Sequence, residues 1–198
     1  SGTKSWTLNF ATMDDKEWQT LCQLKGDMDY RRHSWKYIKE GNTYYLQYYL
    51  TAHTINTYLF KDCTNLKELI LPDQTLEIQS RAFANCKSLQ QMKIPSQTKI
   101  LHPEAWYGCL LMQSASVCPS NPEYMDEEGV IYSKDSTVLV YYPSNKTDSV
   151  YMMPQSVSHL RSYAFSEAAF LRDIQLSENL KAIPRYVRGF ARSSFLKV

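Results

Sequence analysis

Glycine is scarce in this sequence of 198 residues, with only 6 copies that lie far apart. A dinucleotide-binding fingerprint and a P-loop each need several glycines within one tight turn, so the sequence excludes both phosphate-binding motifs. The five cysteines contain no Cys-x-x-Cys pair, and the four histidines stand in neither HxH nor HExxH spacing. Redox motifs, zinc knuckles and zinc-hydrolase sites therefore have no support, and we expect neither a cofactor nor a metal ion.

Long apolar runs and basic runs are also missing. No stretch approaches the ~20 apolar residues of a membrane-spanning helix, so we expect no transmembrane segment. The chain begins without a charged segment followed by an apolar one, so no signal peptide is visible. A formal net charge of +2 without a basic cluster excludes the footprint of a nucleic-acid-binding protein. No Gly-x-Ser-x-Gly elbow is present either, and we expect no enzyme.

A pattern that recurs every 23 residues is the main positive signal. Its copies start at Ile55, Ile78, Leu101 and, after a longer gap, Leu160. Five residues after each start stands an aromatic residue, namely Phe60, Phe83, Trp106 and Phe165. Eight residues after each start stands a small residue, namely Cys63, Cys86, Cys109 and Ala168. Matches at this many offsets in four copies indicate a repeat architecture.

Each copy combines two spacings. Apolar residues fourteen and sixteen positions after the start, such as Met92 and Ile94, alternate with polar ones and predict a short strand with one buried face. Between offsets three and eleven the apolar positions lie three apart, which predicts a helical or 3₁₀ turn. One coil cannot bury enough apolar surface to offset its conformational entropy, so the coils must stack on a shared core.

The pattern in residues 78–95, IQSRAFANCKSLQQMKIP, resembles the BspA-type leucine-rich repeat. The resemblance covers about residues 55–118 and 154–198, and residues 121–143 resemble the hairpin-bearing repeat of the same family. It implies an α/β repeat solenoid, a right-handed coil of short β-strands and helical or 3₁₀ turns. Members are typically surface or secreted proteins of host-associated bacteria and some protozoa, linked to adhesion.

The sequence divides into two regions. Residues 1–54 lack the repeat and are expected to form an N-terminal cap, with a helix near 13–25 and short strands within 35–50. Residues 55–198 carry the repeats, with a hairpin insertion near 121–143. Turn signals at 126–129 and 133–136 separate the expected strands of that hairpin.

The cysteines at one offset are open to two interpretations. Cys63, Cys86 and Cys109 fall in adjacent coils, so they could form a disulfide or metal ladder, or pack as free buried thiols. We favour free thiols, because Ala168 replaces cysteine in the fourth copy. A bridge between Cys22 and Cys118 is the less favoured alternative.

Two groups of residues are candidates for a partner-binding site. The first points away from the core on the strands, and we expect it to line one continuous sheet face: Glu68, Ile70, Gln91, Lys93, Ser114, Ser116, Asp173 and Gln175. The second is a tyrosine cluster: Tyr124, Tyr132, Tyr141, Tyr142 and Tyr151. Tyrosine suits interfaces. The alternative for the first group is an ordinary solvated sheet face without a partner. The alternative for the second is that the tyrosines pack the hairpin onto its coil.

The resemblance and these surfaces together favour a non-enzymatic cell-surface or secreted binding or adhesion module. We expect a monomer that recognises an extracellular protein or glycan. The alternative is a structural or scaffolding repeat domain of a larger surface protein, with no ligand of its own. Catalysis is not favoured, because the sequence shows no clustered titratable groups for a cleft.

Overall fold

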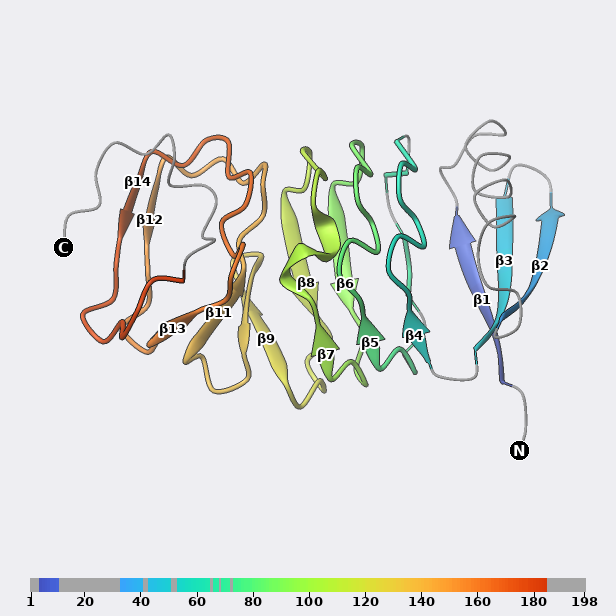
Figure 1. Ribbon diagram of the computed structural model, residues 1–198, viewed down its shortest axis with the longest axis horizontal. Coiled ribbons are helices and arrows are strands. Elements are labelled where there is room, and N and C mark those ends of the chain that lie inside the picture. The colour runs from blue at the N-terminus through green and yellow to red at the C-terminus, as the bar shows by residue number, and fades with distance from the viewer. Residues whose placement is uncertain are drawn as a thin grey trace.

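The repeats wind into successive coils of a β-solenoid, stacked along the long axis of the molecule (Figure 1). The computed structural model describes residues 4–10, 33–40, 43–50, 53–64, 66–67, 69–71 and 73–184. Three coils start in β4 (Thr54–Ile55), β5 (Glu77–Ile78) and β7 (Ile100–Leu101), which pair in parallel. Ile55, Ile78 and Leu101 lie in register, so the 23-residue spacing corresponds to one turn of the solenoid.

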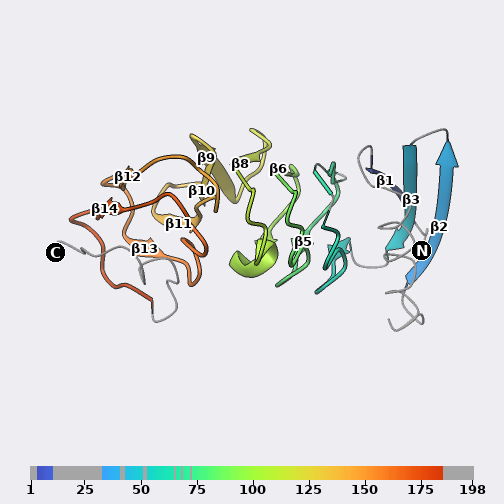
Figure 2. The ribbon, with the colours of Figure 1, turned by 90° about the horizontal axis from the view of Figure 1, so that it is seen from above.

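The strands at offsets thirteen to sixteen form the other side of the coils. Here β6 (Gln91–Ile94) pairs in parallel with β8 (Ser114–Val117), and Figure 2 shows them across the solenoid from β5. Between the two sides lies the apolar core, in which the rings of Phe60 and Phe83 stack with centroids 5.1 Å apart. The core therefore runs along the axis, as a stacked repeat requires.

The segment opposite the sheet of β6 and β8 is a chain of tight turns instead of a helix. Residues three and seven positions after the start have positive φ in several coils, for example Arg81 (58°) and Asn85 (62°) in the coil that starts at Ile78. Left-handed residues interrupt a right-handed helix. The described residues contain one 3₁₀ helix, η2 (Pro103–Trp106), and no α-helix, so the expected α/β class is corrected to a β-solenoid. The helix expected near 13–25 lies outside the described residues.

These turns also carry the stacking. Successive N–H groups alternate between an acceptor three residues back and an acceptor in the next coil. Leu59 N–H donates to Asn56 O within its own coil, whereas Phe60 N–H donates to Ala82 O at 2.7 Å. Consecutive tight turns, each hydrogen-bonded to the same turn of the next coil, therefore account for the three-residue spacing of apolar positions in the sequence.

Three longer strands precede the coils. They are β1 (Lys4–Phe10), β2 (His33–Glu40) and β3 (Thr43–Leu50). All pairings are antiparallel, in the order β1-β3-β2.

The hairpin forms a partition across the solenoid. Strands β9 (Tyr124–Glu127), β10 (Val130–Ser133), β11 (Val138–Tyr141) and β13 (His159–Leu160) make one sheet in the order β13-β11-β10-β9. Both faces of β10 are buried: Ile131 belongs to the core of the preceding coils, and Val130 and Tyr132 to a second core on the far side. The hairpin therefore separates two apolar cores instead of decorating the surface.

Candidate binding surface

Five of the predicted sheet-face residues lie together on one patch, which we call the β6–β8 face. Gln91 pairs with Ser114 and Lys93 with Ser116 in the parallel register, and these side chains point away from the core. Ile70 lies beside β6 and is 65% exposed, which is high for an isoleucine. Alternation along each strand explains the patch, because the intervening residues face the core.

The other sheet-face residues lie elsewhere. Asp173 and Gln175 belong to β14 (Asp173–Gln175), which pairs in parallel with β12 (Val150–Met152) in a separate two-stranded sheet. The expectation of one continuous face is therefore wrong. Glu68, the remaining predicted residue, lies outside the described residues.

The hairpin is the physical cause of this division. Beyond β8, the next coil does not supply a strand, and the hairpin takes that place. Ala115 N–H donates to Gly129 O at 3.0 Å, and Val117 N–H donates to the Asp126 carboxylate at 2.7 Å. These two N–H groups of the β8 edge are thus bonded to the hairpin, which ends the β6–β8 face.

Val150 and Met152 are surface residues that the sequence analysis missed. They flank buried Tyr151 on β12 and are 48% and 71% exposed, next to Asp173 and Gln175. They were missed because this coil is shortened: Leu139 pairs with Leu160, so the two starts are 21 residues apart and not 23. A search for strand alternation alone would have found the Val-Tyr-Met segment.

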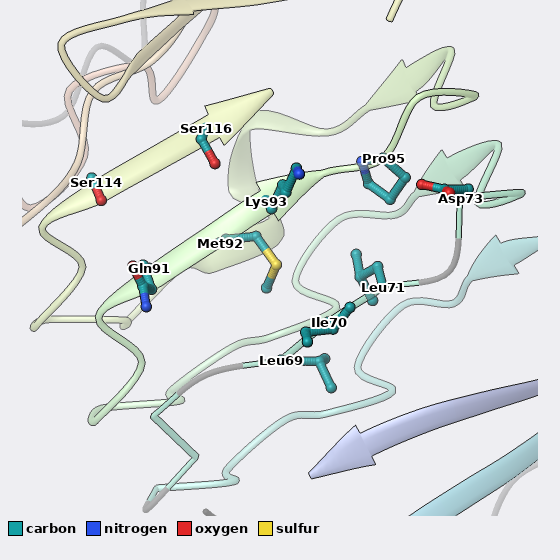
Figure 3. A pocket seen from close by; sticks show the side chains of 10 residues that line it. All are labelled: Leu69, Ile70, Leu71, Asp73, Gln91, Met92, Lys93, Pro95, Ser114 and Ser116. Carbon is teal, nitrogen blue, oxygen red and sulfur yellow. The ribbon is translucent and has the colours of Figure 1, made fainter. Parts of the chain in front are cut away.

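A hollow of about 370 Å³ opens on the β6–β8 face (Figure 3). This volume falls within the range of small ligand sites. Its lining combines core residues with exposed polar ones: Leu69, Ile70, Leu71, Asp73, Gln91, Met92, Lys93, Pro95, Ser114 and Ser116. Lys93 is exposed and makes no ion pair within the described part of the chain.

The tyrosine cluster is buried, with no member more than 8% exposed. Tyr124 has a defined structural contact: its hydroxyl accepts a hydrogen bond from Leu101 N–H and donates to Lys99 O, both at 3.2 Å. Leu101 lies at the edge of the β4-β5-β7 sheet, where the next strand would otherwise bond. The Tyr124 hydroxyl therefore replaces a strand at that edge.

The other four tyrosines pack the partition against the coils. Tyr141 contacts Trp106 with ring centroids 4.7 Å apart, and Tyr142 contacts Tyr151 edge-on at 5.1 Å. The hydroxyls of Tyr132 and Tyr151 are hydrogen-bonded to each other. Burial raises the pKa of Tyr142 and of Tyr151 well above the usual value. These rings present little area to a partner.

The repeated cysteines form a column of free, buried thiols. The Cys86 thiol donates to Phe60 O at 3.0 Å and the Cys109 thiol to Phe83 O at 3.1 Å, one coil back in each case. Burial raises the pKa of the Cys86 thiol, which keeps it protonated and unreactive. Cys118 is also free but half-buried, and a hydrogen bond with Ser120 lowers the pKa of its thiol.

Two features are absent from the described residues. No cluster of three or more histidine, cysteine, aspartate or glutamate side chains there has a metal-binding arrangement. In the same residues, no helix has the length and apolarity required to span a bilayer. Cys22, the other half of the alternative disulfide, lies outside them.

Comparison with known proteins identifies the repeat. The sequence model of the BspA type leucine rich repeat region matches six copies, within residues 40–148 and 140–197. The crystal structure of the pneumococcal vaccine antigen PcpA is similar at 29% identity with a TM-score of 0.57, over 63% of this chain and 31% of that one. A leucine rich cell surface protein from Faecalibacterium prausnitzii A2-165 has the same fold at 22% identity with a TM-score of 0.53, over 66% of this chain and 41% of that one. The chain thus spans less than half of each, and no curated protein sequence matches it.

Proposed function

Because the chain belongs to the BspA-type leucine-rich repeat family, we propose that it is a non-enzymatic binding or adhesion module of a cell-surface or secreted protein. Its partner is an extracellular protein or glycan, and the module acts as a monomer. The β6–β8 face is the binding site.

One observation carries the proposal: the β6–β8 face joins a hollow to exposed side chains on a rigid support. Gln91, Lys93, Ser114 and Ser116 stand on paired strands, so a partner meets them in a fixed arrangement at little ordering cost. Ile70 adds exposed apolar surface beside them. The buried tyrosine cluster lacks this accessibility.

Similarity to surface proteins supports the proposed location. The pneumococcal relative is a vaccine antigen, and the Faecalibacterium protein is described as a cell surface protein. Membership of a repeat family that builds extended binding surfaces agrees with recognition of a partner.

A binding array of matrix proteins and glycans, probed with the intact chain, tests the proposal. Any hit is then measured with a variant carrying Gln91→Ala, Lys93→Ala and Ser116→Ala. A matched control carries Lys87→Ala and Lys99→Ala, two exposed lysines away from this face. We expect the first variant to weaken binding by about tenfold or more and the control to retain it.

Two outcomes contradict the proposal. Binding that survives the β6–β8 variant but is lost on Val150→Ser with Met152→Ser moves the site to the sheet of β12 and β14. An array without any hit favours the alternative, a structural repeat domain that has no ligand of its own.

A further inference from the structure

The lining of the hollow on the β6–β8 face favours one of the two partner classes, protein over glycan. This inference rests on the proposed function. None of the ten described residues that line the hollow is aromatic. These residues therefore offer no flat ring face against which a sugar ring could pack. The aromatic residues of the neighbouring hairpin that could serve, such as Tyr124 and Tyr132, are buried in the two cores.

The apolar part of the hollow favours an aliphatic side chain. Leu69, Leu71 and Met92 border it although they are almost fully buried, so a group that enters the hollow meets the outer surface of the core. Ile70, 65% exposed, adds an apolar wall at the rim. Removing this surface from water is favourable only for an apolar partner group.

The charges in the hollow favour a chain that carries both signs. Lys93 and Asp73 both line it and both are exposed, and Figure 3 shows Pro95 between them. No ion pair joins them in the described part of the chain. A polyanion such as a sulfated glycan would be attracted by Lys93 and repelled by Asp73. A peptide supplies a carboxylate for Lys93 and an N–H donor or a basic side chain for Asp73.

The spacing sets the order of groups along such a peptide. Lys93 pairs with Ser116, and Ile70 stands at the same offset in the preceding coil, so the three form a row across the strands. Neighbouring strands lie about 4.8 Å apart, whereas an extended chain advances about 3.3 Å per residue. Groups that face Ile70 and Lys93 are therefore no more than two residues apart.

We propose that this hollow binds an extended segment of a partner protein, with an aliphatic side chain packed beside Ile70 and an acidic side chain, within two residues of it, facing Lys93. The peptide backbone and a donor group face Asp73 and the serine hydroxyls on β8.

Selection from a random-peptide phage library on the immobilised intact chain tests this assignment. We expect selected peptides to share an aliphatic residue and an acidic residue within two positions. Selection on the Lys93→Glu variant should replace the acidic residue by a basic one, because the charge that it faces is reversed. Lys87→Glu, an exposed lysine of the same coil outside the hollow, is the matched control and should leave the motif unchanged.

Affinities of one selected peptide, measured by fluorescence polarisation, complete the test. We expect Lys93→Glu to weaken binding by about tenfold, with the difference shrinking at high salt. Ile70→Ser should weaken binding by about tenfold as well, whereas Ile100→Ser, at an isoleucine 50% exposed on the opposite sheet, should not.

Three results overturn the assignment. If peptides selected on the Lys93→Glu variant still carry the acidic residue, Lys93 does not recognise that residue. In the second, the library selects no peptide, while a glycan from the binding array binds the intact chain and does not bind the β6–β8 variant. That result overturns the peptide partner but leaves the proposed function standing. Selected peptides that bind all variants equally well, with no array hit at the β6–β8 face, overturn both.

Discussion

Replacing Tyr124 by phenylalanine removes one hydroxyl from the edge of the β4-β5-β7 sheet and leaves the ring in the core. That hydroxyl accepts from Leu101 N–H and donates to Lys99 O, both at 3.2 Å. Leu101 is 1% exposed and Tyr124 5%, so water does not readily take the place of the hydroxyl. The substitution therefore leaves a buried backbone N–H without its partner.

The magnitude follows from these two hydrogen bonds. Each contributes about 0.5–1.5 kcal/mol net, and a buried donor left unsatisfied costs about 1–3 kcal/mol. We expect Tyr124→Phe to lower the free energy of unfolding by about 1–3 kcal/mol. In a chain of this size that corresponds to a fall in the melting temperature of about 2–4 °C for each kcal/mol.

Urea denaturation followed by circular dichroism measures the change, with an unchanged slope showing that the compactness of the two states is retained. Tyr107→Phe is the matched control, because Tyr107 is half-buried and its hydroxyl makes no hydrogen bond to any residue that the structure describes. We expect the control to change stability by less than about 0.5 kcal/mol. Equal midpoints for Tyr124→Phe and the unsubstituted chain would refute the idea that this hydroxyl replaces a strand.

Three more outcomes are expected. Burial raises the pKa of Glu167, so its folded form holds a proton more tightly than the unfolded chain, and stability should fall as the pH rises from about 4 through that raised pKa. Glu167→Gln, whose amide oxygen still accepts from Gly108 N–H, should flatten this fall in urea midpoints measured across the same range. Gly129→Ala should cost about 1–3 kcal/mol in the same assay, because Gly129 has φ of 80° and a Cβ there would lie 3.0 Å from Ser114 Cβ. With a thiol reagent on the native chain, Cys118→Ser should remove a fast phase of labelling, because hydrogen bonding lowers the pKa of the Cys118 thiol. The first prediction is contradicted if Glu167→Gln leaves the pH dependence of the urea midpoint unchanged. The second is contradicted if Gly129→Ala leaves the midpoint unchanged, and the third if Cys118→Ser keeps the fast phase of labelling.

The stacking of the coils could be predicted because one spacing specifies both register and core. Once Ile55, Ile78 and Leu101 are aligned, Phe60 falls over Phe83, as the structure shows. The turns could not be assigned in the same way. Residues such as Arg81 and Asn85 have positive φ without being glycine, and the spacing of apolar residues does not distinguish consecutive turns from a helix.

The site was only partly predictable, for a reason of topology. Alternation placed Gln91, Lys93 and Ser116 on an outward face, because it depends on local backbone geometry alone. That the hairpin bonds to the edge of β8 depends on contacts such as Val117 N–H to Asp126, which no local pattern specifies. The shortened coil also hid Met152, because a fixed period misses a coil of different length.

The partition formed by β9, β10 and β11 has a consequence for how the molecule comes apart. Each side keeps its own apolar interior, with the hairpin between the two, and polar contacts such as that of Gly108 N–H with the Glu167 carboxylate also link the sides. In a solenoid, a loss of structure spreads from one coil to the next through shared packing. We therefore expect amide hydrogens of the coils around Phe83 and those around Phe165 to exchange in separate groups, with fraying of the last coils slowed at the hairpin before it reaches Lys93.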